Sequence, residues 1–161
     1  MSSTKLSRSP RSDFRKRDLP IVLCVDDDRA VLESLRRLFR GEPYEVVTVA
    51  SPGQALGVLR LGTVGVVIAD ERMPGESGSE LLAEVRERWP WIGRVILTAY
   101  PGPEVTASGA KAGVDHLLTK PWDAESLKRT VERLLQDVQR TRRMSQSVGE
   151  EPSEGDDSMK S

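Results

Sequence analysis

The stretch IVLCVDDD, residues 21–28, joins five apolar residues to three consecutive acids. An apolar run without alternation is typical of a strand that is buried on both faces of a sheet. The acids stand where such a strand would end, and ligands of parallel α/β sheets bind at the carboxyl ends of the strands. The stretch therefore predicts the first strand of an α/β domain with an acidic site at its end.

Further apolar runs follow along the chain, and three of them also lead into polar residues. The runs are YEVVTVA (44–50), VGVVIA (64–69), RVIL (94–97) and DHLL (115–118). Asp70 follows the second of these, Thr98 the third, and Thr119 and Lys120 the fourth, whereas the first ends on Ser51 without a comparable group. In a parallel sheet, these groups would converge on one edge although they are far apart in sequence.

Helical patterns lie between the predicted strands. Four of these patterns begin at a helix-capping residue. The remaining pattern, around 104–112, has no such residue and follows Pro101-Gly102-Pro103. The expected caps are Asp28, Ser51, Ser77 or Ser79, and Asp123. Alternating strands and helices predict a single doubly wound (βα)5 domain, in which right-handed crossovers place helices on both faces of a five-stranded parallel sheet.

The two ends of the chain differ from the middle in composition. Residues 1–18 are basic and residues 143–161 are acidic, and both are too polar to bury a core, so we expect disordered tails around a domain at 19–142. The basic segment is either a solvated tail or a contact for an anionic partner. The net charge of -1 argues against direct nucleic-acid binding by the whole chain. A single cysteine, no spanning apolar run and no secretory signal predict a cytoplasmic protein without membrane insertion.

The acids and the lysine indicate phosphoryl-transfer chemistry. Asp26, Asp27 and Asp70 would repel one another unless a cation lay among them, and oxygen ligands favour Mg²⁺, with Mn²⁺ as an alternative. Asp70 is the natural nucleophile, because a carboxylate can attack phosphorus. Lys120 would contribute a positive charge and Thr98 a hydrogen bond to the phosphoryl oxygens.

Four motifs resemble those of the receiver domain of bacterial two-component response regulators, of the kind that chemotaxis regulators represent. They are VLCVDDD, VVIADERMPGESG, VILTAY and LTKPWD, and the resemblance covers residues 19–142. It implies a flavodoxin-like strand order 2-1-3-4-5 and a signalling domain rather than an enzyme with an external substrate. Most relatives carry an output domain after the receiver, whereas only a short acidic tail follows the last predicted helix here, so we expect a stand-alone receiver, with truncation before an output domain as the alternative.

The resemblance further implies roles for single residues. The phosphoacceptor is Asp70, the metal ligands are Asp26, Asp27, Asp70 and the backbone carbonyl of Arg72, the remaining site residues are Thr98 and Lys120, and the Lys120–Pro121 peptide is cis. The implied phosphoryl donor is a histidine kinase or a histidine phosphotransfer protein. The output is a phosphorelay or a protein target bound on the face of the fourth helix, fifth strand and fifth helix, with an active homodimer as one form.

Two positions depart from the family pattern. Leu117 stands where relatives carry a switch aromatic residue, so the usual coupling of a ring rotation to Thr98 is in question. Tyr100 or Trp122 are candidate substitutes. Arg72 and Tyr100 occupy the positions that flank the path of the attacking water in relatives, where bulky side chains would slow phosphoryl loss.

The same residues also allow structural roles and other functions. Asp26, Asp27 and Asp28 could serve only to cap a helix, Asp70 could be a turn residue, and Lys120 could be a solvated loop residue. A degenerate receiver would bind proteins independently of phosphorylation. A phosphatase with an aspartate nucleophile is less favoured, because such enzymes carry Asp-x-Asp followed by Thr after the first strand, and this chain has neither that Thr nor a cap insertion.

Overall fold

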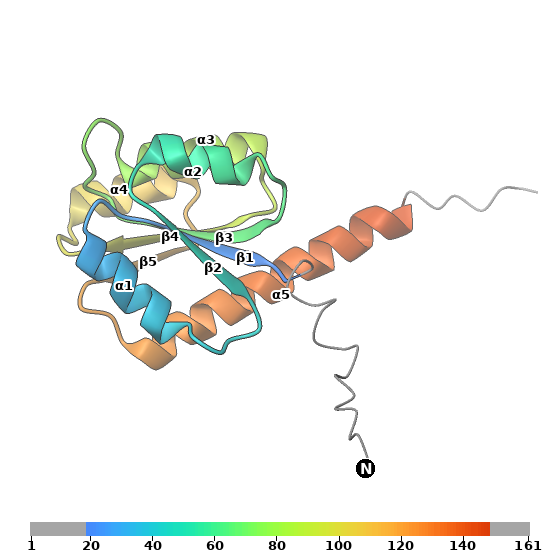
Figure 1. The fold of residues 1–161 in the computed structure, drawn as a ribbon. Coiled ribbons are helices and arrows are strands. Elements are labelled where there is room, and N and C mark those ends of the chain that lie inside the picture. The colour runs from blue at the N-terminus through green and yellow to red at the C-terminus, as the bar shows by residue number, and fades with distance from the viewer. Residues whose placement is uncertain (1–18, 149–161) are drawn as a thin grey trace, which may run out of the picture.

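The computed structural model describes residues 19–148, and strands and helices alternate throughout this part of the chain (Figure 1). The elements are β1 (Ile21–Val25), α1 (Arg29–Leu38), β2 (Glu45–Val49), α2 (Pro52–Leu59), β3 (Val64–Ala69), α3 (Gly78–Arg88), β4 (Gly93–Thr98), α4 (Pro103–Ala112), β5 (His116–Thr119) and α5 (Ala124–Val148). The expectations for residues 1–18 and for 149–161 lie outside the described residues. No helix among the described residues is long and apolar enough to cross a membrane.

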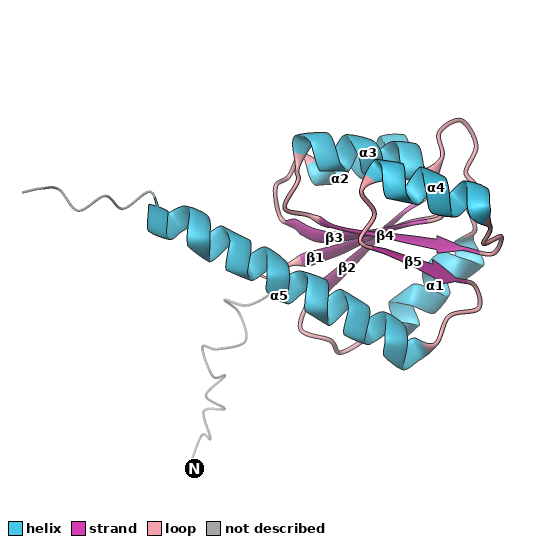
Figure 2. Cartoon of the chain, turned by 180° about the vertical axis from the view of Figure 1, so that it is seen from behind, coloured by secondary structure: helices cyan, strands magenta, loops and turns pink. Residues whose placement is uncertain are grey.

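The strands form one parallel sheet in the order β2-β1-β3-β4-β5. Helices α1 and α5 cover one face of the sheet, and α2, α3 and α4 cover the other (Figure 2). The predicted doubly wound fold and its flavodoxin-like strand order are therefore confirmed. This order brings the ends of β1 and β3 side by side at the centre of the sheet, with β4 next to β3.

The core lies on both faces of the sheet, as the unbroken apolar runs predicted. Every residue of β1, β3 and β4 is buried. The edge strands β2 and β5 are mostly half-buried, so burial on both faces was wrong for these two. The three central strands thus carry the polar groups at their ends on a rigid, fully packed support.

Four of the five helices begin at the predicted capping residues. A side-chain oxygen accepts a backbone N–H at the start of α1 (Asp28), α2 (Ser51), α3 (Ser77) and α5 (Asp123). Helix α4 begins after Gly102 without a side-chain cap, although Pro103 occupies its first turn. Capping contributes about 1 kcal/mol, so the first turn of α4 is held less firmly than those of the other helices.

Helix α5 is longer than the sequence predicted. Its apolar stripe is buried as expected: Leu127, Val131, Leu134, Leu135 and Val138. The helix then continues to Val148, whereas we expected the domain to end at residue 142 and a disordered tail to begin at 143. Residues 139–145 are exposed, and the helix extends past the sheet (Figure 1). Strong helix formers such as Gln, Arg and Met sustain it where packing does not.

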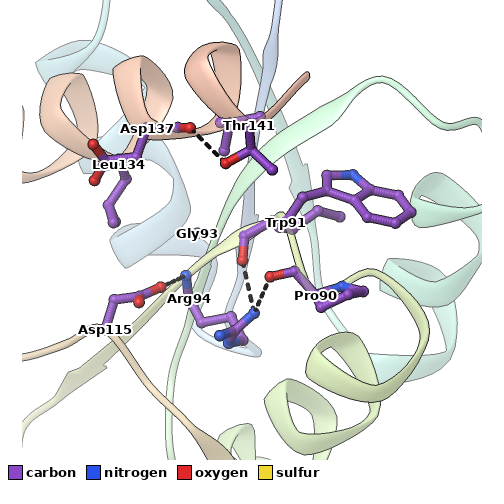
Figure 3. Close-up of a pocket in the computed structure, with 10 residues that line it drawn as sticks. Pro90, Trp91, Gly93, Arg94, Asp115, Leu134, Asp137 and Thr141 are labelled. Carbon is purple, nitrogen blue, oxygen red and sulfur yellow. Dashed lines mark hydrogen bonds between the residues drawn. The ribbon is translucent and has the colours of Figure 1, made fainter. Parts of the chain in front are cut away.

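A buried arginine lies at the amino edge of the sheet. Arg94 is 9% exposed, and its guanidinium donates to the carbonyls of Gly113, Pro90 and Ile92 at 2.9, 3.2 and 2.9 Å. Arg94, Pro90 and Ile92 also line a cavity of about 310 Å³ between β4 and α5 (Figure 3). Burial lowers the pKa of Arg94, and the nearby Asp115 carboxylate opposes this effect. The cavity is at the opposite end of β4 from Thr98.

Candidate functional site

The predicted site residues meet at the carboxyl edge of the sheet. Asp26 follows β1, Asp70 follows β3, Thr98 ends β4, and Lys120 follows β5. Strand order alone produces this arrangement, because β1 and β3 are paired and β4 and β5 are paired in register up to Thr98 and Thr119. The convergence expected from the apolar runs is therefore seen.

Three carboxylates form a compact cluster at this edge. One oxygen each from Asp26, Asp27 and Asp70 lies within 4.8 Å of the others. Asp26 is buried at 3% exposed, Asp70 is half-buried and Asp27 faces solvent. A hard divalent cation such as Mg²⁺ takes oxygen ligands and keeps several waters, and this open-sided carboxylate set fits that preference. The donor chemistry thus matches the metal that the sequence predicted.

Lys120 contacts two of these carboxylates, those of Asp26 and Asp70. Its Nζ lies 2.7 Å from Asp26 Oδ2 and 3.4 Å from Asp70 Oδ1. Burial lowers the pKa of Lys120, but the hydrogen bond and charge of Asp26, together with the charge of Asp70, outweigh this, so its pKa is raised and the ammonium form is held. Lys120 is thus a fixed positive charge between the acids.

The environment of the Asp70 carboxyl combines burial with nearby charges of both signs. Burial raises the pKa of the Asp70 carboxyl, the adjacent Asp26 adds to this effect, and Lys120 opposes it. A carboxylate that has lost part of its hydration and is not fully compensated by a cation is a better nucleophile than a solvated one. This environment suits a group that must attack an electrophile.

Thr98 lies at the site but is turned toward its own loop. The side chain is 1% exposed, and its Oγ1 accepts a hydrogen bond from the backbone N–H of Tyr100 at 3.1 Å. Its carbonyl accepts from the Lys120 N–H at 2.8 Å. Among the described residues no hydrogen bond joins the Thr98 hydroxyl to Asp70 or Lys120. The hydroxyl retains its own proton for a further acceptor.

The segment after Asp70 packs closely against it. A Cβ on Gly78 would lie 2.2 Å from the Asp70 carbonyl oxygen, so no larger residue fits there. The Glu71 carboxylate accepts from the Ser79 backbone and hydroxyl at 3.2 and 2.6 Å, which fixes the start of α3 against the site. Sequence reasoning missed this pair and offered either Ser77 or Ser79 as the helix cap, a role that Ser77 takes. The acid eight positions before a helical serine carries no recognisable local signal.

Two of the residues at which the sequence departs from the family pattern, Arg72 and Tyr100, contact each other. The Arg72 guanidinium lies over the Tyr100 ring, 4.2 Å from its centroid. Leu117 is half-buried and packs against the core on the α2–α3 side of the sheet. The Lys120–Pro121 peptide is cis, as expected.

A protein-family model matches most of the chain. The model of the response regulator receiver domain matches residues 22–132. The chain belongs to this family. It is therefore a receiver domain of two-component signalling systems, and the suspected resemblance is confirmed.

Curated relatives of this receiver include a transcriptional regulatory protein and a response regulator. It is 40% identical over 111 residues to the hydrogenase transcriptional regulatory protein HoxA of Cupriavidus necator, an alignment that covers 68% of this chain and 23% of HoxA. It is 36% identical to the response regulator protein FleR of Pseudomonas aeruginosa, over 66% of this chain and 22% of FleR. The chain thus spans about a quarter of the length of these relatives.

Solved structures agree with the receiver fold. The signal receiver domain of an HD domain-containing protein from Pseudomonas fluorescens Pf-5 has a TM-score of 0.75 at 28% identity, covering 78% of this chain and 93% of that one. A CheY-like response regulator receiver domain protein from Methanospirillum hungatei JF-1 has a TM-score of 0.72 at 27% identity, covering 76% and 98%. The likeness extends over most of the described residues.

Proposed function

We propose that the chain accepts a phosphoryl group on Asp70, with Mg²⁺ bound by Asp26, Asp27, Asp70 and the Arg72 carbonyl. The donor would be a histidine kinase or a histidine phosphotransfer protein. The observation that supports this most is the position of Lys120, whose ammonium lies between Asp26 and Asp70. A structural salt bridge needs one acid, whereas two converging acids beside a third are typical of a site for a cation and an anionic group.

The proposed transfer needs no separate catalytic base. An Asp70 carboxylate oxygen attacks phosphorus, the new P–O bond forms as the P–N bond of a phosphohistidine breaks, and the imidazole nitrogen keeps the electron pair. The Lys120 ammonium binds a phosphoryl oxygen and offsets the negative charge of the phosphoryl group. The Thr98 hydroxyl donates a hydrogen bond to another phosphoryl oxygen. Bound Mg²⁺ would neutralise charge on the acids and the phosphoryl group.

The proposed output is a protein interaction or a phosphorelay, read on the α4–β5–α5 face. Thr98 is followed directly by the loop that leads to α4, and α4 has no side-chain cap. A pull on Thr98 would thus reach the least firmly held helix of the described chain. A homodimer through this face is one active form that we propose, and we expect no direct nucleic-acid contact. We place the protein in the cytoplasm, where the buried Cys24 thiol stays reduced.

The test is phosphorylation by a small donor. With acetyl phosphate and Mg²⁺, intact-mass measurement should show one added phosphoryl group on the wild type and none on Asp70→Asn. Asp137→Asn, which changes an exposed carboxylate on α5, is the matched control and should label as the wild type does. Labelling of Asp70→Asn at the wild-type level would rule out Asp70 as the acceptor.

The degenerate receiver is the second candidate function. If the wild type stays unlabelled with both acetyl phosphate and a panel of histidine kinases, while a partner binds it equally well with and without a phosphodonor, that candidate replaces the first. Turnover of an external phosphate ester would instead favour the phosphatase, which the missing Thr after the first-strand acids argues against.

A further inference from the structure

One contact joins the loops that follow β3 and β4 without belonging to the set of acids and lysine. The Arg72 guanidinium stacks on the Tyr100 ring at 4.2 Å from the centroid, and Tyr100 is 60% exposed. Arg72 belongs to the loop after β3 and Tyr100 to the loop after β4. The stacked pair therefore joins the two loops that follow the reactive residues of neighbouring strands.

Each partner of this contact is tied to a reactive residue. Arg72 stands two positions after Asp70. Tyr100 donates its backbone N–H to the Thr98 hydroxyl at 3.1 Å. Any rearrangement of Asp70 or Thr98 around a phosphoryl group would therefore act on one side of the stack or the other.

The charge balance of the site favours a move of the guanidinium on phosphorylation. Three carboxylates face one ammonium in the cluster. A phosphoryl group on Asp70 adds negative charge and strong acceptor oxygens. A planar guanidinium binds such oxygens through two parallel N–H bonds, and charge-assisted bonds of this kind are stronger than an exposed cation–π contact. Arg72 has no salt bridge among the described residues that would hold it back.

We propose that Arg72 is a phosphoryl-binding residue, and that its transfer from the Tyr100 ring to the phosphoryl oxygens releases Tyr100 as the aromatic signal of this receiver. This inference rests on the proposed phosphorylation of Asp70. It assigns the role of the missing switch aromatic to a ring whose release depends on an arginine. Leu117 has no ring to reorient, whereas Tyr100 lies at the surface, in the loop that leads to α4.

If the stack opens on phosphorylation, the environment of the Tyr100 ring should change. The chain contains two tyrosines, and Tyr44 is 5% exposed in the core, so 3-fluorotyrosine labelling gives two fluorine resonances with an internal reference. Addition of beryllofluoride with Mg²⁺, a stable phosphoryl mimic, should shift the Tyr100 resonance and leave that of Tyr44 in place. The variant Tyr100→Phe assigns the two signals.

Substitution of Arg72 separates phosphoryl binding by the guanidinium from release of the Tyr100 ring. In Arg72→Gln, the Tyr100 resonance should already stand near its released position before the mimic is added, and the mimic should move it little. Beryllofluoride affinity should fall by at least roughly tenfold, because the charge-assisted bonds from the guanidinium to the mimic are lost. Arg60→Gln, an exposed arginine at the far end of α2, is the control and should behave as the wild type.

The outcomes separate this inference from the proposed function. If the mimic binds, seen as Mg²⁺-dependent shifts of the Thr98 and Lys120 amides, but the Tyr100 resonance does not move, the stack is a static cover and the inference fails while phosphorylation stands. If Arg72→Gln binds the mimic as tightly as the wild type, Arg72 is not a phosphoryl ligand. If no amide responds to the mimic and Asp70 takes no label, the proposed function itself fails.

Discussion

Removal of the Asp70 charge should stabilise the metal-free protein. The variant Asp70→Asn keeps the size of the side chain and deletes a carboxylate that crowds Asp26. A residue placed for reaction often costs stability, because the groups that make it reactive also disfavour its charged form. The expected gain can be worked out from the distances in the site.

The pairwise charge terms on Asp70 nearly cancel. The cluster oxygens of Asp26 and Asp70 lie within 4.8 Å, which corresponds to a repulsion of at least about 3.5 kcal/mol at an effective dielectric constant of about 20. Asp27 faces solvent and adds about 1 kcal/mol. Lys120 at 3.4 Å attracts by about 5 kcal/mol on the same scale. What remains is the desolvation of a side chain that is 12% exposed, on the order of 1–3 kcal/mol.

Urea unfolding followed by circular dichroism measures this gain. In EDTA at pH 7.5, Asp70→Asn should raise the free energy of unfolding by about 1–3 kcal/mol. The pKa of Asp70 is raised in the folded protein, so protonation favours the folded state, and the wild type loses stability as the pH rises through that pKa. The advantage of the variant should therefore fade as the pH falls through it. Excess Mg²⁺ should also reduce the advantage, because only the wild type retains all three carboxylates.

Two results would refute this reasoning. One is a variant that is less stable than the wild type in EDTA at pH 7.5, which would mean that the Lys120 contact outweighs burial and repulsion together. The other is a difference that stays constant between acid and neutral pH, which would mean that the charge of Asp70 is not its source.

Further predictions concern the metal, the packing and the signal. Asp26→Ala combined with Asp27→Ala should abolish Mg²⁺ binding in calorimetry while circular dichroism shows an intact fold; unchanged affinity would remove the proposed metal site. Gly78→Ala should lower the free energy of unfolding by about 2–4 kcal/mol, because its Cβ would meet a carbonyl at 2.2 Å, whereas Gly53→Ala, with nothing within 4 Å, should not; equal effects would contradict the close contact. Amide hydrogen exchange with and without beryllofluoride should change most across residues 98–113; changes centred on α1 and α2 would contradict the proposed route to the output face.

The sheet and its acidic edge could be predicted because both follow from short-range patterns. Unbroken apolar runs mark strands buried on two faces, and the parallel topology then fixes which chain positions meet. Asp26, Asp70 and Lys120 stand directly at strand ends, so their convergence needed no knowledge of side-chain conformation. Helix caps were equally local, since each depends on one side chain and an amide two or three positions later.

Features that depend on side-chain direction could not be predicted. The sequence placed Arg72 and Tyr100 beside the site but could not show that they stack on each other. Arg94 read as the polar start of a strand, and its burial depends on carbonyls from two separate turns. The extension of α5 past residue 142 depends on helix propensity continuing beyond the apolar stripe, where periodicity gives no signal.

The guanidinium of Arg94 gives β4 a mechanical role. By binding carbonyls of the α3–β4 turn and of the α4–β5 turn, it clamps the amino end of the strand, while Thr98 stands at the other end. The carboxyl end of β4 is held separately, by its pairing with β5 up to Thr119 and by the hydrogen bond that the Lys120 N–H donates to the Thr98 carbonyl. Because both ends of β4 are fixed in this way, we expect a force on the Thr98 side chain to displace the residues between Thr98 and Gly102, which lead into α4, rather than the strand itself.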